Sequence, residues 1–299
     1  MKRYFHGENR TGPYFEGWYF KCRTVDGRSL ALIPAIHIGK NGEKNASIQV
    51  ITEKQAWYLE YPASAFSAAV HVLSIQTGGS RFSREGLLLD LEGEGLSLRG
   101  RIGFGPFRCL KSDIMGPFRW LSRMECAHSV ISMEHTLQGR AELNGCVLDF
   151  GGGTGYIEAD RGSSFPSAYL WTQCGWPDGS LMLSIAAVPL VGRSFTGCIC
   201  AIVLKGRELR LATYRGVRIQ SWSPKGAILR QGRYRLKVEL LEQEPQPLRA
   251  PAFGSMSRTV HESLCAKVRY RFWQGKSLLL DHTDSHAGFE YAKGNAVNG

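Results

Sequence analysis

The chain has 299 residues, of which 43% are hydrophobic, so it can bury one large core or two ordinary ones, and intrinsic disorder is not expected. Its 37 Lys and Arg against 26 Asp and Glu leave a net charge of +11. These charges are dispersed and accompany no nucleic-acid-binding motif, so we expect no nucleic-acid partner. Weak peripheral association with anionic lipid headgroups stays open as an alternative.

No segment reaches the roughly 20 apolar residues of a membrane span, and no apolar stretch follows the basic residues at the start. The eight cysteines are dispersed, and Cys198 and Cys200 form neither a redox pair nor half of a zinc site. We therefore expect a cytoplasmic protein with reduced thiols. We also expect no metal and no other cofactor, because no His, Cys and carboxylate residues have the spacing of metal ligands.

Short runs of aliphatic, β-branched and aromatic residues predict strands along the whole chain. In chain order the expected strands cover residues 30–38, 47–52, 57–61, 70–75, 86–91, 96–102, 135–143, 181–188, 197–204, 208–213, 234–241, 264–273 and 277–281. Strands separated only by turn signals favour an all-β sandwich or barrel over an α/β fold. Residues 242–259 contain three prolines and predict a long surface loop. Five arginines at strand spacing are expected on solvent-facing sides of the sheet: Arg215, Arg218, Arg230, Arg233 and Arg235.

Two similar segments indicate an internal duplication. Trp18 precedes Asp26-Gly27 and an aliphatic run, and Trp171 precedes Asp178-Gly179 and a second aliphatic run about 150 residues later. Asp-Gly favours a turn with positive φ that closes a β-hairpin, so each half is expected to open with a hairpin, with Trp18 equivalent to Trp171. A weaker match between residues 155–158 and 288–290 places the boundary of two domains at 1–158 and 159–299.

The run Gly12-Pro13-Tyr14-Phe15-Glu16-Gly17-Trp18-Tyr19-Phe20-Lys21 resembles the opening motif of the tocopherol cyclase-like family. Further similar segments are residues 124–130, 132–137, 155–158 and 164–173, with a last one at 287–291. The resemblance implies two tandem lipocalin-like (calycin-like) β-barrel units, as in carotenoid hydratases and fungal pericyclases. It also implies cyclisation of a prenylated quinol without metal or nucleotide. The chain departs from the family motif at Ala159 and Arg161, where a lysine and a tryptophan are usual.

Such chemistry needs a buried carboxylic acid to protonate an alkene and aromatic faces to stabilise the cation. Glu16 is the first candidate acid because alternation along a strand places it on one face with Tyr14 and Trp18. A purely structural role for Glu16, as a hydrogen-bond acceptor, is an equal alternative. Glu158 and Asp160, beside Arg161, are the second catalytic candidates, and the alternative for them is an ion pair within the linker that joins the two domains.

The expected ligand-binding residues are aromatic or able to hydrogen-bond a polar headgroup: Tyr14, Trp18, Tyr19, His128, Trp171 and Gln173. Core packing is the alternative for Trp171, and hydrogen bonding is the alternative for Gln173. His128 is interpreted as a pocket residue and His135 as structural.

The sequence therefore predicts a cofactor-independent, acid-catalysed cyclase, isomerase or hydratase that acts on a prenylated or isoprenoid-like apolar molecule. Whether it is an enzyme at all stays open. The alternative hypothesis is a non-catalytic lipocalin-like carrier of a hydrophobic ligand. A third hypothesis is a peripheral membrane or interaction protein that uses its basic surface.

Overall fold

The computed structural model describes residues 3–120, 124–190 and 193–293. Strands dominate these residues, and the only helices among them are three short 3₁₀ turns, at Ala63–Ala65, Gly116–Trp120 and Thr213–Arg215. The all-β prediction is confirmed. In the described part of the chain, no helix has the length and apolar character needed to cross a membrane.

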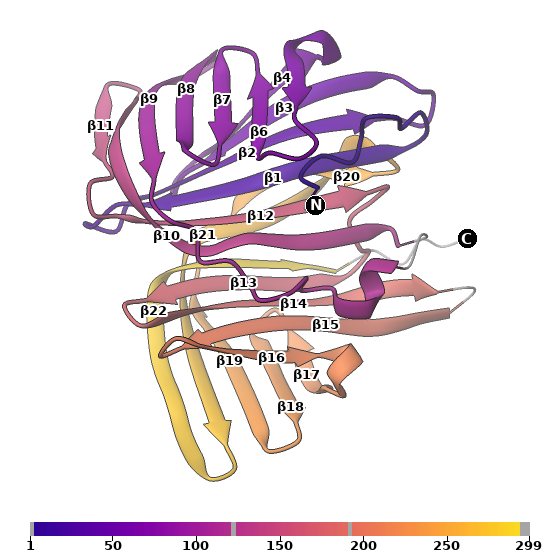
Figure 1. Cartoon of the computed structure of the whole chain (residues 1–299), viewed down its shortest axis with the longest axis vertical. Coiled ribbons are helices and arrows are strands. Elements are labelled where there is room, and N and C mark those ends of the chain that lie inside the picture. Colours follow the sequence, from indigo (N-terminus) through magenta and orange to yellow (C-terminus); the bar gives the residue numbers. More distant parts are fainter. Residues whose placement is uncertain (1–2, 121–123, 191–192, 294–299) are drawn as a thin grey trace. The chain divides into compact units, whose positions relative to one another are not determined.

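The first sheet has twelve antiparallel strands in the order β4-β3-β2-β1-β12-β10-β9-β8-β7-β6-β5, with β11 paired to β10 (Figure 1). Its strands are β1 (Tyr14–Arg23), β2 (Ser29–Ile38), β3 (Lys44–Ile51), β4 (Ala56–Pro62), β5 (Phe66–Ala68), β6 (Ser74–Thr77), β7 (Ser80–Ser83), β8 (Gly86–Gly93), β9 (Leu96–Phe104), β10 (Cys126–Leu143), β11 (Cys146–Asp149) and β12 (Thr154–Gly162). Buried side chains from most of these strands form one core cluster, which includes Trp18, Ile48, Phe82 and Leu137. The sheet therefore curls around a single core.

The second sheet has ten strands in the order β16-β15-β14-β13-β22-β21-β19-β18-β17, with β20 paired to β21. Its strands are β13 (Tyr169–Trp176), β14 (Gly179–Leu190), β15 (Arg193–Leu204), β16 (Arg207–Ala212), β17 (Arg218–Ser223), β18 (Gly226–Gln231), β19 (Tyr234–Glu242), β20 (Gln246–Ala252), β21 (Ser255–Gln274) and β22 (Ser277–Ala292). It also encloses one core cluster, with Leu183, Leu229, Tyr270 and Phe289 among its members. Both sheets begin with a four-strand meander whose first strand pairs with the last long strand of the same half.

The chain divides into two compact units. The first unit contains residues 1–109, 128–165 and 248–259, and the second contains residues 110–127, 166–247 and 260–299. Each unit therefore includes a segment from the other half of the chain: residues 248–259 in the first and residues 110–127 in the second. The prediction of two continuous domains, 1–158 and 159–299, did not foresee this exchange.

Two predicted elements were wrong. Residues 70–73 are not a strand, because β6 begins only at Ser74. Residues 242–259 are not a loop but contain β20 and the start of β21, with Leu248 and Ala250 buried. Prolines are tolerated in β20 because this strand pairs only with β21 and so leaves one edge without a ladder partner. The five arginines from Arg215 to Arg235 are exposed, as expected.

The predicted equivalence of Trp18 with Trp171 is one residue out of register. Cys22 pairs with Leu30 across the first hairpin and Cys174 pairs with Leu181 across the second, and both cysteines face their cores. Counting back along each strand, Trp171 is level with Tyr19 rather than with Trp18. The two turns also differ. Gly27 in the first turn has a φ of 93°. In the second hairpin, where Trp176 pairs with Gly179, neither Asp178 nor Gly179 has a positive φ.

Candidate functional site

The pairing of β1 with β12 sorts the predicted site residues of the first unit onto two faces. Residues directly opposite each other in an antiparallel pair project to the same side of the sheet. On the core face, Glu16 pairs with Arg161 and Trp18 with Ala159. On the reverse face, Gly17 pairs with Asp160, Tyr19 with Glu158, and Lys21 with Tyr156. The two groups of predicted catalytic carboxylates therefore lie on opposite faces.

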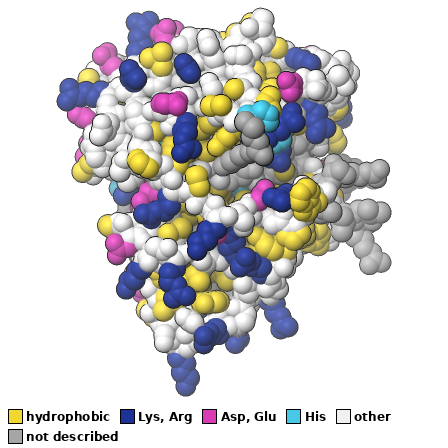
Figure 2. Space-filling view, viewed as in Figure 1, with side chains coloured by type: hydrophobic (Ala, Val, Ile, Leu, Met, Phe, Trp, Pro, Cys, Tyr) yellow, Lys and Arg dark blue, Asp and Glu magenta, His cyan; other side chains and the backbone are white. Residues whose placement is uncertain are grey.

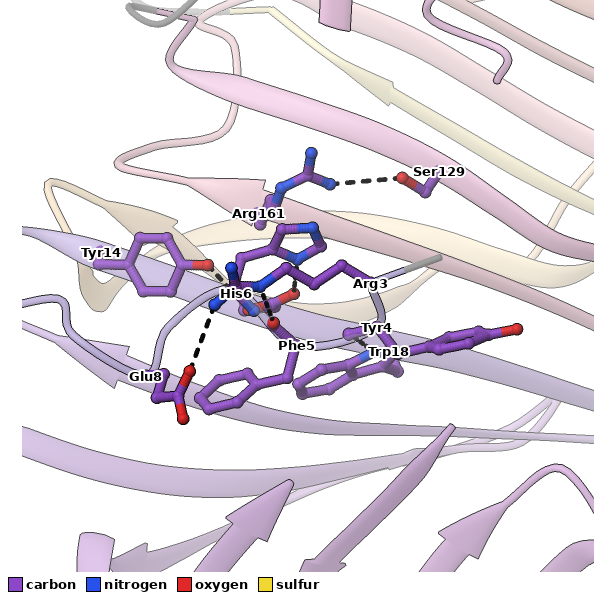
Figure 3. A network of polar contacts seen from close by, with 10 residues as sticks. Arg3, Tyr4, Phe5, His6, Glu8, Tyr14, Trp18, Ser129 and Arg161 are labelled. Carbon is purple, nitrogen blue, oxygen red and sulfur yellow. Dashed lines mark hydrogen bonds and ion pairs between the residues drawn. The ribbon is translucent and has the colours of Figure 1, made fainter. Parts of the chain in front are cut away.

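On the core face, Glu16 accepts three hydrogen bonds (Figure 3). The backbone N–H of His6 donates over 2.7 Å, His6 Nδ1 donates over 2.8 Å, and the Tyr14 hydroxyl donates over 2.8 Å. The Glu16 side chain is 2% exposed. Burial raises the pKa of Tyr14, and the adjacent Glu16 carboxylate raises it further, so the phenol remains a neutral donor. Glu16 therefore attaches the segment before β1 to the sheet.

Trp18 packs in the same region and is fully buried in the core cluster. Its ring stacks on Phe66 at 6.2 Å between centroids and contacts Phe5 at 6.2 Å. Its indole N–H donates to the Tyr4 carbonyl over 3.2 Å. The Trp18 ring, which was expected to bind a ligand, is thus covered by side chains of the protein itself.

On the reverse face, His128 lies between two carboxylates. Its Nδ1 is 3.0 Å from Asp160 Oδ1, and its Nε2 is 3.4 Å from Glu158 Oε2. The Tyr156 hydroxyl donates to the Glu158 carboxylate. We call these four residues the His128 cluster. It brings together three of the predicted site residues from β10 and β12.

Each imidazole nitrogen of His128 faces a carboxylate. Nδ1 lies within hydrogen-bond distance of Asp160, whereas the 3.4 Å contact of Nε2 with Glu158 is not a hydrogen bond. Burial raises the pKa of Tyr156 well above its usual value, and Glu158 and Asp160 raise it further. Tyr156 is therefore a neutral donor to Glu158. His128 is 8% exposed and Glu158 5%, whereas Asp160 is partly exposed, so Asp160 is the more accessible end.

His128, Glu158 and Asp160 also form a group that could hold a metal ion. One ligand atom from each lies within 4.8 Å of the others. The expectation of no metal site rested on the spacing of possible ligands along the chain. That premise was wrong, because spacing along the chain cannot show that β10 and β12 lie side by side in the sheet. The donor set of one imidazole and two carboxylates suits zinc and similar ions. In the described arrangement, however, both imidazole nitrogens already face carboxylates.

The remaining predicted residues lie in the second unit. Trp171 pairs with Glu290 and Gln173 pairs with Gly288, on the face opposite the core cluster. Both predicted side chains are buried at 6% exposure. Tyr169 donates a hydrogen bond to Glu290, as Tyr156 does to Glu158 in the first unit.

Sequence reasoning missed several of these polar residues. His6 lies ten residues before Glu16, and no local pattern connects the two. Glu290, which lies opposite Glu262 of β21, contributes to the sequence analysis only through the repeat at residues 288–290. Tyr156 could have been found, because alternation along a strand places it on one face with Glu158.

Solved structures of low sequence identity superpose on this chain. CghA in complex with Sch210972 does so with a TM-score of 0.58 at 9% identity, covering 94% of this chain and 89% of that protein. Kievitone hydratase from Nectria haematococca gives 0.56 at 9%, covering 97% and 93%. A proposed AttH from Nitrosomonas europaea gives 0.55 at 13%, covering 96% and 92%. The chain has the fold of these proteins.

The comparison with CghA, kievitone hydratase and AttH concerns the fold, because identities of 9 to 13% leave the site residues free to differ. No family model matches the chain, and no curated protein sequence matches it. The resemblance to the tocopherol cyclase-like family is therefore supported at the level of a shared fold and not for that family specifically.

Proposed function

We propose that the chain is a cofactor-independent acid catalyst, a hydratase or cyclase of a prenylated or otherwise apolar small molecule. In this proposal each unit is a lipocalin-like barrel, and the two arose by duplication. Two of the proteins that share the fold support it. One is a hydratase by name, and the other was solved with the small molecule Sch210972.

The His128 cluster is the observation that carries this proposal. In this proposal His128 carries the proton that is delivered, and the carboxylates of Asp160 and Glu158 orient its imidazole. In the proposed reaction the cluster transfers one proton to an alkene carbon of the substrate, which leaves a carbocation. Water or a substrate hydroxyl then adds to that carbon, and its released proton returns to the cluster. The cycle consumes no proton and needs no oxidant.

Glu16 is less suited to this task than Glu158. Its carboxylate already accepts three hydrogen bonds from His6 and Tyr14, so its oxygens are engaged in attaching the segment before β1 to the sheet. We therefore assign Glu16 to the structural alternative and Glu158 with His128 to proton transfer. Asp160 positions His128 through Nδ1.

The test uses a farnesylated hydroquinone as the probe, with products analysed by mass spectrometry. Hydration adds the mass of one water, and cyclisation leaves the mass unchanged but alters the retention time. We expect Glu158→Gln and His128→Gln to lower turnover by about 10²-fold or more while binding of the probe persists. Glu142→Gln is the matched control, because Glu142 is an exposed glutamate on the same strand as His128.

Unchanged turnover in both cluster variants would refute this assignment. Binding without turnover in the unmutated protein would favour the carrier hypothesis instead. Elemental analysis and assays with a chelator complete the test: stoichiometric zinc, or activity lost on chelation, would show that the cluster acts through a metal ion and not as a proton donor.

A further inference from the structure

Three arginines of the second unit lie in one row across three neighbouring strands. Arg218 on β17 pairs with Arg230 on β18, which pairs with Arg235 on β19. The row continues through Trp273 on β21 to Leu278 on β22. All three arginines are exposed, so this is the solvent-facing side of the sheet.

Like charges directly opposite each other on paired strands destabilise a sheet. Among the residues that the structure describes, none of the three arginines has a carboxylate partner. Other basic residues of the same sheet are paired: Lys237 and Arg271 with Glu239, Lys267 with Glu242, and Arg269 with Asp281. Among the described residues of this sheet, carboxylate partners are thus common but not universal: the row lacks them, and so does Arg207 on β16.

Protection of a sheet edge explains only part of the row. Charged residues on an edge strand prevent pairing with other chains, and β17 is an edge strand. Arg230 and Arg235, however, lie on β18 and β19, which have neighbours on both sides. Their charge needs another explanation.

Further cations and one exposed leucine adjoin the row at the tips of two hairpins. The N–H of Gly275 in the β21–β22 turn donates to the Arg233 carbonyl in the β18–β19 turn over 2.7 Å, so Arg233 and Lys276 lie at adjacent tips. Leu278, which ends the row on β22, is 50% exposed. Figure 2 shows Lys and Arg side chains together with hydrophobic ones over this part of the second unit.

We propose that this basic face, formed by Arg218, Arg230, Arg233, Arg235 and Lys276 with Leu278 beside them, binds the surface of an anionic phospholipid membrane. Phosphate headgroups supply the negative charge that the row lacks, and each basic residue near such a surface strengthens binding several-fold. Leu278 enters the boundary between headgroups and acyl chains, where exposed apolar side chains are stabilised.

A lipid surface fits this face better than a nucleic acid does. Single-stranded nucleic acids bind where aromatic rings are free to stack on bases. Here the Trp273 ring is covered by the guanidinium groups of Arg235 at 5.2 Å and Arg271 at 5.6 Å from its centroid. The exposed apolar side chain at the tips, that of Leu278, is aliphatic, and this favours a membrane.

The experiment measures sedimentation of the full chain with vesicles of phosphatidylcholine alone or with 30% phosphatidylglycerol. We expect binding only to the anionic vesicles, and loss of binding in 0.5 M NaCl, which screens exposed charges. Arg218→Gln, Arg230→Gln and Arg235→Gln together should lower the partition coefficient by about 100-fold. The matched control replaces Lys54, Arg81 and Arg101, three exposed basic residues of the first unit.

Equal loss in the control triple variant would overturn the proposal, because total charge and not this face would then decide binding. Leu278→Ser separates the two macromolecules: we expect about a five-fold loss of vesicle binding, with no change in retention on heparin. Binding to an oligonucleotide but not to anionic vesicles would also overturn it. Circular dichroism on each variant shows whether the sheet is intact, and turnover of the farnesylated hydroquinone without vesicles should be unchanged.

Discussion

His135 should make the stability of the first unit depend on pH. Burial lowers the pKa of His135 from the ordinary 6.5 to about 4. Its ring contacts those of Phe104 and Phe107, at 4.6 and 4.9 Å between centroids. Ser132 Oγ donates to the Glu134 carbonyl, so Nδ1–H of the neutral ring donates to Ser132 Oγ over 3.0 Å.

The sign of the effect follows from the two protonation states. The unfolded chain binds a proton at His135 below about pH 6.5, whereas the folded chain binds it only below about pH 4. Between these values the unfolded state holds more protons, so the free energy of unfolding falls as the pH falls. The slope is about 1.4 kcal/mol per pH unit, and the whole loss is about 3 kcal/mol, complete below pH 4.

Urea unfolding followed at half-unit steps from pH 4 to pH 7.5 measures this loss, and NMR titration of the imidazole C–H signals gives the pKa directly. The variant His135→Asn keeps a donor for Ser132 but cannot titrate, so its stability should lack this slope. His71→Asn is the control, because His71 is exposed. The reasoning fails if His135→Asn and the unmutated protein lose stability in parallel as the pH falls.

Two further predictions concern packing around β1 and β12. Gly155→Ala should destabilise the protein by about 1–3 kcal/mol in urea unfolding, because the added Cβ would lie 2.3 Å from His135 Nε2. Gly12→Ala, where a Cβ meets no atom within 4 Å, should have little effect, and equal losses in both would contradict the packing argument. Glu16→Gln should cost about 1–3 kcal/mol because an amide has a single acceptor oxygen for the donors of His6 and Tyr14. Its turnover should be retained, and a variant of normal stability that loses turnover would restore Glu16 as the proton donor.

Much of the fold could be predicted from local patterns. Alternating apolar residues and turn signals identified most of the strands, since the two-residue period of a strand is visible in any short window. The same period correctly placed Glu16 with Tyr14 on one face of β1. The failures came where local composition was ambiguous. The prolines of residues 242–259 predicted a loop because the sequence does not show that β20 pairs on one side only.

The site itself depended on tertiary structure. Glu16 and Glu158 were both identified as buried carboxylates, but nothing in a single strand shows that they occupy opposite faces of the β1–β12 pair. That distinction depends on register, because a shift of one residue moves a side chain to the other face. Register also decides that Trp18 and Trp171 are not equivalent, although the two sequence segments predicted that they are.

The sequence by itself therefore determined that this chain forms strands, which residues alternate along them, and which carboxylates are flanked by aromatic residues. These properties depend on neighbours one to four positions away. Only the tertiary structure decided that His128 lies between Glu158 and Asp160, that His6 donates to Glu16, and that Arg218, Arg230 and Arg235 form a row. Each of these contacts joins strands or segments that are distant in the sequence or set by register, and pairing between strands follows from the packing of a whole core.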